Sequence, residues 1–192
     1  GQPWYAGETL SVGIGQSYWT ATPMQLAVAT AMVANKGEHL IPRLLRGKIQ
    51  DGAFEEALIA HREKLTLSDS NNWDVITRGM RNVNMAQKGT AHRAFKDAPY
   101  SSAGKTGTAQ VRSLGQEEEY NAEDIAERYR DNAMYVGYAP ADDPKVVVVV
   151  AIENSLGGGG SIAAPVARKI LDVWHTRFNN GKKQQEETNA DD

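Results

Sequence analysis

The sequence predicts an α+β fold in which an antiparallel sheet is flanked by helices. Residues 133–139 and 145–152 are indicated as strands, because both are rich in residues favoured in sheets and a short turn joins them. Apolar residues spaced three and four positions apart predict helices before and after these strands. The 192 residues, 41% hydrophobic and 23% charged, suit about one globular domain.

The first predicted helix begins at Pro23. Thr22 precedes it as the N-cap, Pro23 suits the first helical position, and Gln25 completes a capping box. The segment Asn35-Lys36-Gly37 ends the helix. Its expected core stripe consists of Leu26, Ala29, Thr30 and Val33.

A second helix is predicted after Ser70-Asn71-Asn72, which we interpret as its polar cap. A short helical turn is expected to follow Thr90. Residues 40–67, between the two long helices, mix short apolar runs with turn residues and are expected to form an irregular connector. The expected core face of the second helix consists of Trp73, Ile76, Met80 and Val83.

A further strand is predicted through Lys105, reached by residues 98–104 and continuing to Val111. Five successive valines from Val146 favour a central strand that is covered on both faces. The long connection over residues 112–132 contains an acidic run, Glu117-Glu118-Glu119, and a helical turn is expected near its end, through Ile125, Ala126 and Tyr129. Such long connections are commonly functional or mobile, whereas an acidic run alone is typical of a solvated face.

The C-terminal part predicts one more helix and a tail. Gly157 to Gly160 are expected to form a flexible turn before a helix over about residues 163–178. Residues 182–192 are polar and are expected to be disordered, which sets the predicted domain at residues 1–181. The apolar residues expected on this helix are Val166, Ile170, Val173 and Trp174.

Charge and composition argue against several classes of function. A net charge of −3 gives no indication of nucleic-acid binding, and no apolar run is long enough to span a bilayer. The chain has no cysteine, and the four histidines, at 39, 61, 92 and 175, lack the spacing of a metal site. The sequence therefore predicts no metal and no organic cofactor.

The segment Lys105-Thr106-Gly107-Thr108 suits the binding of an acyl substrate at a strand edge. Lys105 supplies a positive charge, and Thr106 and Thr108 supply hydroxyl donors for a substrate carboxylate. Gly107 leaves the edge without a side chain, and the Thr108 N–H is available for a developing oxyanion.

Two other interpretations of glycine-rich segments fail on spacing. A phosphate-binding loop that ends in Gly104-Lys105-Thr106 would need a glycine at position 99, where the chain has Pro99. A dinucleotide-binding fingerprint starting at Gly13 would need a glycine at position 18, where the chain has Tyr18.

Four segments in one order resemble the transpeptidase domain of class B penicillin-binding proteins, and in particular its elongation-specific group. The resemblance covers roughly residues 4–178 and includes Trp4-Tyr5-Ala6-Gly7-Glu8-Thr9. The four segments are Gly13 to Ala27, Lys88 to Ala91, Gly104 to Val111, and Tyr135 to Val146. The resemblance implies a β-lactamase/transpeptidase-like fold, of which this chain holds the C-terminal part.

The resemblance also implies a serine acyl transfer that cross-links peptidoglycan. Lys105 and Thr108 would be catalytic, while Thr106, Gly107 and Thr108 would bind the substrate. The implied partners are stem peptides ending in D-Ala-D-Ala, β-lactam antibiotics, and proteins of the elongation complex. The implied location is the periplasmic face of the bacterial inner membrane, with a membrane anchor preceding this chain.

The family's nucleophile motif, Ser-x-x-Lys, and its Ser-x-Asn motif both precede the segment that begins here at Gly13. Ser102 and Lys105 match the first motif formally, and Ser70 and Asn72 match the second. Residues three apart on a strand point to opposite faces, so Ser102 is a poor candidate for the nucleophile. We therefore expect the nucleophile outside this chain, and the chain alone to be inactive. A D,D-carboxypeptidase, a β-lactamase and a non-catalytic sensor module remain alternatives.

Overall fold

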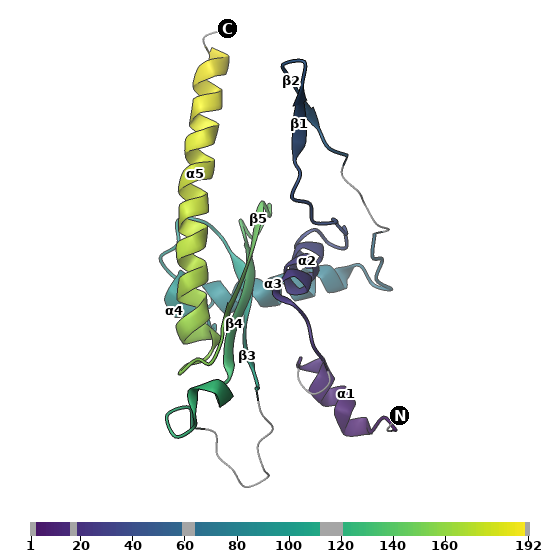
Figure 1. The fold of residues 1–192 in the computed structure, drawn as a ribbon, viewed down its shortest axis with the longest axis vertical. Coiled ribbons are helices and arrows are strands. Elements are labelled where there is room, and N and C mark those ends of the chain that lie inside the picture. The colour runs from purple at the N-terminus through teal and green to yellow at the C-terminus, as the bar shows by residue number, and fades with distance from the viewer. Residues whose placement is uncertain (1–2, 16–18, 59–63, 112–120, 191–192) are drawn as a thin grey trace.

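A computed structural model of the chain describes residues 3–15, 19–58, 64–111 and 121–190, with residues 179–190 as backbone only. A three-stranded sheet forms the centre, with α4 and α5 on one side and α2 on the other (Figure 1). The elements are α1 (Ala6–Gly13), α2 (Pro23–Ala34), β1 (Gly47–Gln50), β2 (Ala53–Glu56), α3 (Asn71–Met85), α4 (His92–Phe95), β3 (Ala103–Ala109), η1 (Glu127–Tyr129), β4 (Asn132–Ala139), β5 (Val146–Ile152), η2 (Gly159–Ala163) and α5 (Ala164–Ala190).

The central sheet is antiparallel, in the order β3-β4-β5, so the α+β prediction is confirmed. The strands β4 and β5 begin and end within one residue of the predicted ones. The first strand differs from its prediction because it begins only at Ala103, so Ser102 lies just before the strand. Pro99 lacks the N–H that a strand ladder needs, which is consistent with residues 98–102 staying outside the sheet.

Two clusters of buried side chains hold the sheet, one on each face. The larger cluster lies between the sheet and helices α4 and α5, and the rings of Phe95 and Tyr135 stack in it with centroids 5.5 Å apart. The smaller cluster joins the opposite face to α2 through Ala34, Ala103 and Tyr138. The smaller cluster thus supports β3 near its N-terminal end, through Ala103.

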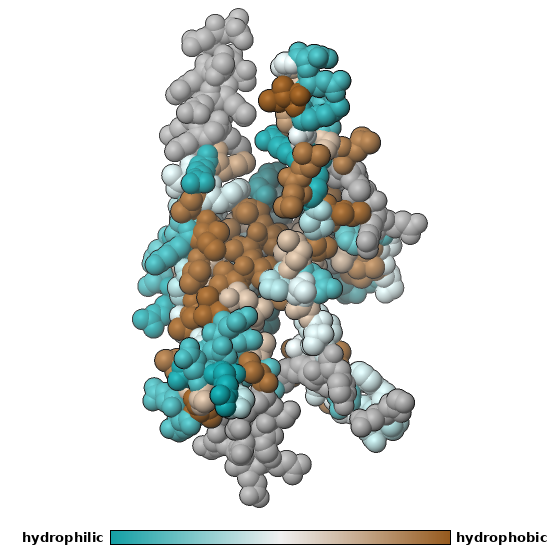
Figure 2. All heavy atoms as spheres, viewed as in Figure 1, coloured by the Kyte–Doolittle hydropathy of each residue, from teal (hydrophilic) through white to brown (hydrophobic). Residues whose placement is uncertain are grey.

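The valine-rich strand β5 is not central in the described sheet, so that prediction is wrong. It contacts α2 and α5 on its two faces but pairs only with β4. A run of valines indicates that both faces of a strand are covered, but it does not indicate where the strand lies in the sheet. Figure 2 shows a broad hydrophobic surface on this side of the molecule, between α5 and α2. Three apolar residues of α5 are exposed: Val166, Ile170 and Val173.

Helices α2 and α3 form as predicted, with different details at their ends, but Ala29 of the predicted α2 core stripe is exposed. The capping box of α2 is confirmed, since Thr22 N–H donates to Gln25 Oε1 at 2.8 Å and Gln25 N–H donates to Thr22 Oγ1 at 3.2 Å. Ser70 makes no side-chain cap for α3, and Asp69 Oδ1 instead accepts a bond from the Asn71 N–H at 2.9 Å. Ile76 is 43% exposed, so the predicted core face of α3 is wrong at this residue.

Two elements were not predicted. The connector contains the β1-β2 hairpin, which projects from the body as Figure 1 shows, and its turn places Asp51 and Gly52 at φ values of 52° and 85°. Asp-Gly is a strong hairpin signal because both turn positions need positive φ. Helix α1 has no side-chain cap and no buried residue, so neither capping nor a core stripe marked it in the sequence.

The last third of the chain also departs from the predictions. The predicted helical turn near residue 125 is a 3₁₀ turn at Glu127–Tyr129, and Glu117-Glu118-Glu119 lie outside the described residues. The backbone of α5 continues to Ala190, so the tail predicted to be disordered is helical up to that residue. Lysine, glutamine and glutamate have high helix propensity, which polarity alone conceals. Among the described residues, no helix is long and apolar enough to cross a membrane.

Candidate active site

Strand β3 presents the predicted site residues at an open edge of the sheet. In the described sheet it pairs only with β4, which leaves its other edge available to an extended peptide. The register places Lys105 opposite Val136 and Thr106 opposite Tyr135. Because side chains alternate along a strand, Lys105 lies on the face covered by α2, and Thr106 and Thr108 lie on the other face.

A cavity of about 440 Å³ lies against β3 and brings together two of the segments singled out in the sequence. Its lining includes Lys105 to Gln110, together with Gly15, Trp19 and Leu26 from the Gly13 to Ala27 segment. Lys105 is exposed, and its Nζ donates to the carbonyl of Thr106 at 2.5 Å. All four predicted site residues, Lys105, Thr106, Gly107 and Thr108, therefore line one cavity.

Thr90 is a residue of this site that the sequence did not mark as functional. Its Oγ1 lies 2.9 Å from Thr106 Oγ1, so the two hydroxyls share a hydrogen bond. Thr90 precedes α4, and Gly160 lies so close to it that an added Cβ would be 2.3 Å from the Thr90 carbonyl. The only sequence signal was the position of Thr90 in the Lys88 to Ala91 segment of the resemblance.

The glycine segment before α5 is a close-packed support for β3, which corrects the prediction of a flexible turn. Gly159 is buried and begins the π-helical turn η2. A Cβ on Gly159 would lie 2.1 Å from the Met134 carbonyl oxygen and 2.6 Å from that of Gly107. By contrast, a Cβ on Gly107 would meet only Met134 Cβ, at 3.4 Å. The absent side chain of Gly107 therefore keeps space for a ligand, and that of Gly159 lets η2 reach the sheet.

Ser102 is part of the structure behind the site and is not available as a nucleophile. It is fully buried, and its Oγ accepts a bond from Asn84 Nδ2 at 2.9 Å. The same Asn84 Nδ2 donates to the Tyr135 hydroxyl at 2.8 Å, which joins α3 to the sheet. Burial raises the pKa of Tyr135 above the usual tyrosine range, and the Asn84 bond opposes this shift in part.

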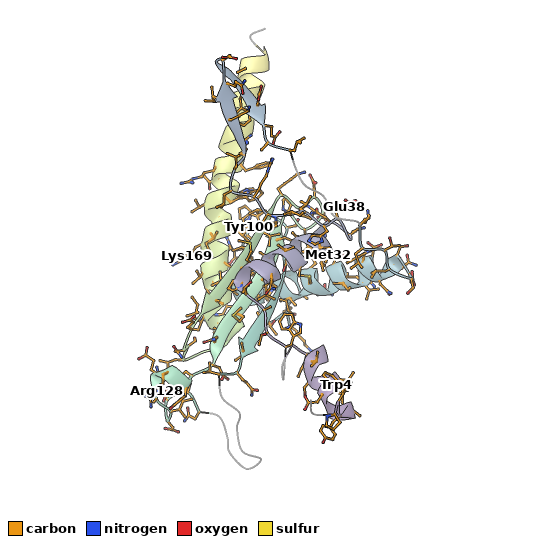
Figure 3. All side chains as sticks on the ribbon, turned by 45° about the vertical axis from the view of Figure 1, so that its right-hand side comes forward. Trp4, Met32, Glu38, Tyr100, Arg128 and Lys169 are labelled. Carbon is orange, nitrogen blue, oxygen red and sulfur yellow. The ribbon has the colours of Figure 1, made fainter. Side chains whose placement is uncertain are left out.

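A second polar group fixes the approach to β3 against α5. The Tyr100 hydroxyl donates to Asp172 Oδ1 at 2.8 Å, and Arg168 Nε donates to the same oxygen at 2.6 Å. Figure 3 shows Tyr100 between the sheet and the long helix. Burial, with the neighbouring Asp172 carboxylate, raises the pKa of Tyr100. Tyr135 is thus held by a buried polar contact with Asn84, and Tyr100 by a partly buried one with Asp172.

No group of three or more His, Asp or Glu side chains in the described ranges is placed to hold a metal ion. The chemistry that this edge offers is that of the Lys105 ammonium group, the two hydroxyls of Thr106 and Thr108, and free strand backbone. Such groups can bind a carboxylate and polarise a carbonyl.

A family model, the penicillin binding protein transpeptidase domain, matches residues 1–172. The chain is 46% identical over 178 residues to the peptidoglycan D,D-transpeptidase MrdA of Haemophilus influenzae, which covers 90% of this chain and 26% of the relative. The chain thus spans about a quarter of the length of that protein.

Solved structures resemble the chain in three dimensions. Penicillin-binding protein 2 of Pseudomonas aeruginosa, solved in complex with WCK 5153, is 39% identical with a TM-score of 0.71, and the match covers 90% of this chain and 34% of that one. Penicillin-binding protein 2 of Helicobacter pylori, solved in complex with MreC, is 24% identical with a TM-score of 0.66. This match covers 90% of this chain and 29% of that one, and it shows that the two share a fold. The family model, the order of the four segments along the chain and the cavity that two of these segments line all agree. The chain belongs to the penicillin-binding protein transpeptidase domain family.

Proposed function

We propose that this chain is the C-terminal segment of a peptidoglycan D,D-transpeptidase and forms the strand-edge side of its active site. The single observation that carries the proposal is the cavity in which Lys105 to Thr108 meet the segment around Gly15. That the Haemophilus influenzae relative is a peptidoglycan D,D-transpeptidase favours a transpeptidase over a carboxypeptidase, a β-lactamase or a sensor module.

In the proposed reaction, a serine oxygen attacks the carbonyl carbon of the penultimate D-alanine of a stem peptide. The C–N bond breaks, the terminal D-alanine leaves as the protonated amine, and an amine of a second stem then attacks the ester. Thr106 and Thr108 hold the terminal carboxylate through their hydroxyls. Lys105 supports the negative charge and the proton network, and the Thr108 N–H donates to the oxyanion. The nucleophile comes from sequence outside this chain, so the isolated chain gains no mass on incubation with a β-lactam.

The proposed partners follow from the same assignment. β-Lactams occupy the donor position in this proposal. The Pseudomonas aeruginosa relative was solved in complex with WCK 5153, which motivates the proposal of a small-molecule ligand. The complex of the Helicobacter pylori protein with MreC motivates the proposal of elongation-complex partners. We also propose that the complete protein is anchored in the inner membrane with this domain on the periplasmic face.

Lys105 provides the test. A lysine on an exposed strand contributes about 0–1 kcal/mol to stability through surface ion pairs, so Lys105→Ala should leave the melting temperature of the full-length protein nearly unchanged. The rate of β-lactam acylation should fall about 100-fold, the scale of losing one preorganised electrostatic contact. Lys105→Arg should recover part of this loss, because guanidinium differs from ammonium in shape and hydration.

A matched control is Lys145→Ala, since Lys145 is also exposed and pairs only with a surface carboxylate, that of Asp143, at 2.8 Å. This variant should acylate at the parent rate. Normal acylation by Lys105→Ala, or an equal loss in the control, would contradict the proposed function.

A further inference from the structure

A second cavity, of about 540 Å³, adjoins the site on the α4 side of β3. The hydrogen bond between Thr90 and Thr106 connects the two cavities, because Thr90 lines the second and Thr106 lines the first. Whatever Thr106 binds is therefore one hydrogen bond away from this second cavity. The residues around it are Thr90, Arg93, Ala94, Gly160, Ser161 and Pro165.

The lining of this cavity suits an anion. It contains the guanidinium of Arg93 and the hydroxyls of Thr90 and Ser161, and none of its residues carries a carboxylate. The Ser161 hydroxyl already donates its proton to the Gly158 carbonyl at 3.2 Å, so Arg93 is the group of this lining that can attract an anion. A guanidinium favours a planar carboxylate, which it can bind through two parallel hydrogen bonds.

Arg93 on α4 and Arg168 on α5 differ in whether their guanidinium groups already have partners. Arg168 is committed to the fold, since it binds Asp172 and the carbonyl oxygens of Ala94 and Asp97 at 2.6, 3.0 and 3.3 Å. Arg93 has no hydrogen bond and no ion pair with any other residue in the described ranges, and it is exposed. Its charge is therefore available to a ligand at no cost to an existing contact.

We propose that Arg93 forms an anion-binding subsite, connected to Thr106 through the Thr90 hydroxyl, that extends the Lys-Thr-Gly site and takes a carboxylate of the peptide substrate on the leaving-group side. The proposal rests on the proposed function, in which Thr106 holds the terminal carboxylate of the donor. That carboxylate belongs to the D-alanine that leaves. The second cavity, which Thr90 connects to Thr106, would therefore lie beside the leaving residue. The acceptor amino acid enters where that residue departs. The carboxylate at Arg93 is therefore that of the donor's last residue or that of the acceptor.

The experiment uses the full-length protein with a peptide thioester donor and either D-alanine or D-alaninamide as acceptor. These acceptors differ in whether the carboxylate is free. If the subsite holds the acceptor carboxylate, Arg93→Gln lowers the ratio of aminolysis to hydrolysis about tenfold with D-alanine, the lower end of a hydrogen bond to a charged group. The ratio with D-alaninamide stays at the parent value.

The donor arm compares D-Ala-D-Ala peptides with a free and an amidated C-terminus. If the subsite holds the donor carboxylate, Arg93→Gln slows acylation about tenfold with the free peptide only. Thr90→Val, which keeps the shape and removes the hydroxyl, should act in the same direction as Arg93→Gln. The matched control is Lys96→Gln, an exposed cation at the C-cap of α4 that does not line the cavity.

A tenfold effect confined to the free carboxylate, in either arm, supports the subsite and identifies its source. The amidated ligands report on folding, because a misfolded variant would lose activity with both forms. Parent values for Arg93→Gln in both arms, or losses equal with free and amidated ligands, overturn the subsite while the proposed function stands. Normal acylation by Lys105→Ala overturns the proposed function, and the subsite with it.

Discussion

Replacing Gly159 by alanine tests whether the glycine before α5 supports β3, the strand of the candidate site. Local propensity favours the change, because alanine is about 1 kcal/mol better than glycine in a helix. The tertiary contacts oppose it. The new Cβ would lie 2.1 Å from the Met134 carbonyl oxygen, and it must withdraw to at least 3.0 Å, a movement of about 0.9 Å.

The atoms in the way are backbone atoms of β3 and β4, and β4 is held by ladders on both sides. No rotamer change can relieve the contact, so the cost lies at the upper end of the overpacking range, about 3 kcal/mol. Sterics therefore outweigh propensity, and Gly159→Ala should destabilise the protein by about 2 kcal/mol. Displacement of Gly107 should also slow β-lactam acylation.

Urea unfolding, followed by tryptophan fluorescence, measures the stability change. Gly79→Ala is the matched control, because Gly79 is an exposed position in α3 where an added Cβ meets nothing within 4 Å. This control should gain about 1 kcal/mol from propensity alone. If Gly159→Ala were as stable as the parent, or gained stability as Gly79→Ala should, close packing of η2 on β3 would be the wrong explanation.

Three further predictions concern the site and its supports. In the full-length protein, Thr106→Val and Thr108→Val should each slow acylation by an amount corresponding to about 1.5–3 kcal/mol, because a hydroxyl bond to a carboxylate is lost. Stopped-flow acylation rates at the parent level would refute the carboxylate assignment. Asn84→Ala should lower the free energy of unfolding by about 1–3 kcal/mol, since Ser102 and Tyr135 lose their buried partner; urea titration checks this, with the exposed Asn82→Ala as control. Stability should fall as the pH rises above about 10, because unfolded tyrosines ionise there while buried Tyr100 and Tyr135, whose pKa values are raised, keep their protons. Urea midpoints from pH 8 to 11 measure this, and a flat profile would contradict it.

Predictions made from local signals held where one segment contains the whole cause. The capping box depends on two residues three positions apart, Thr22 and Gln25. The pairing of β4 with β5 depends on two strands joined by a short turn. Predictions failed where a long-range contact decided the outcome. The valines of β5 indicated a covered strand, but not its position at the edge of the described sheet. The Asp51-Gly52 turn lies in a polar connector whose hairpin was not predicted.

The sequence by itself determined the family, the principal helices and strands, and the chemical groups of the site, because periodicity, caps and ordered motifs are written along the chain. Only the tertiary structure decided how these groups meet. It joined Thr90 to Thr106, sixteen residues apart, and buried Ser102 against Asn84, eighteen residues apart. It also pressed Gly159 onto the backbone of Gly107. Each of these contacts depends on the packing of α3, α4 and η2 around one strand edge, which no local pattern encodes.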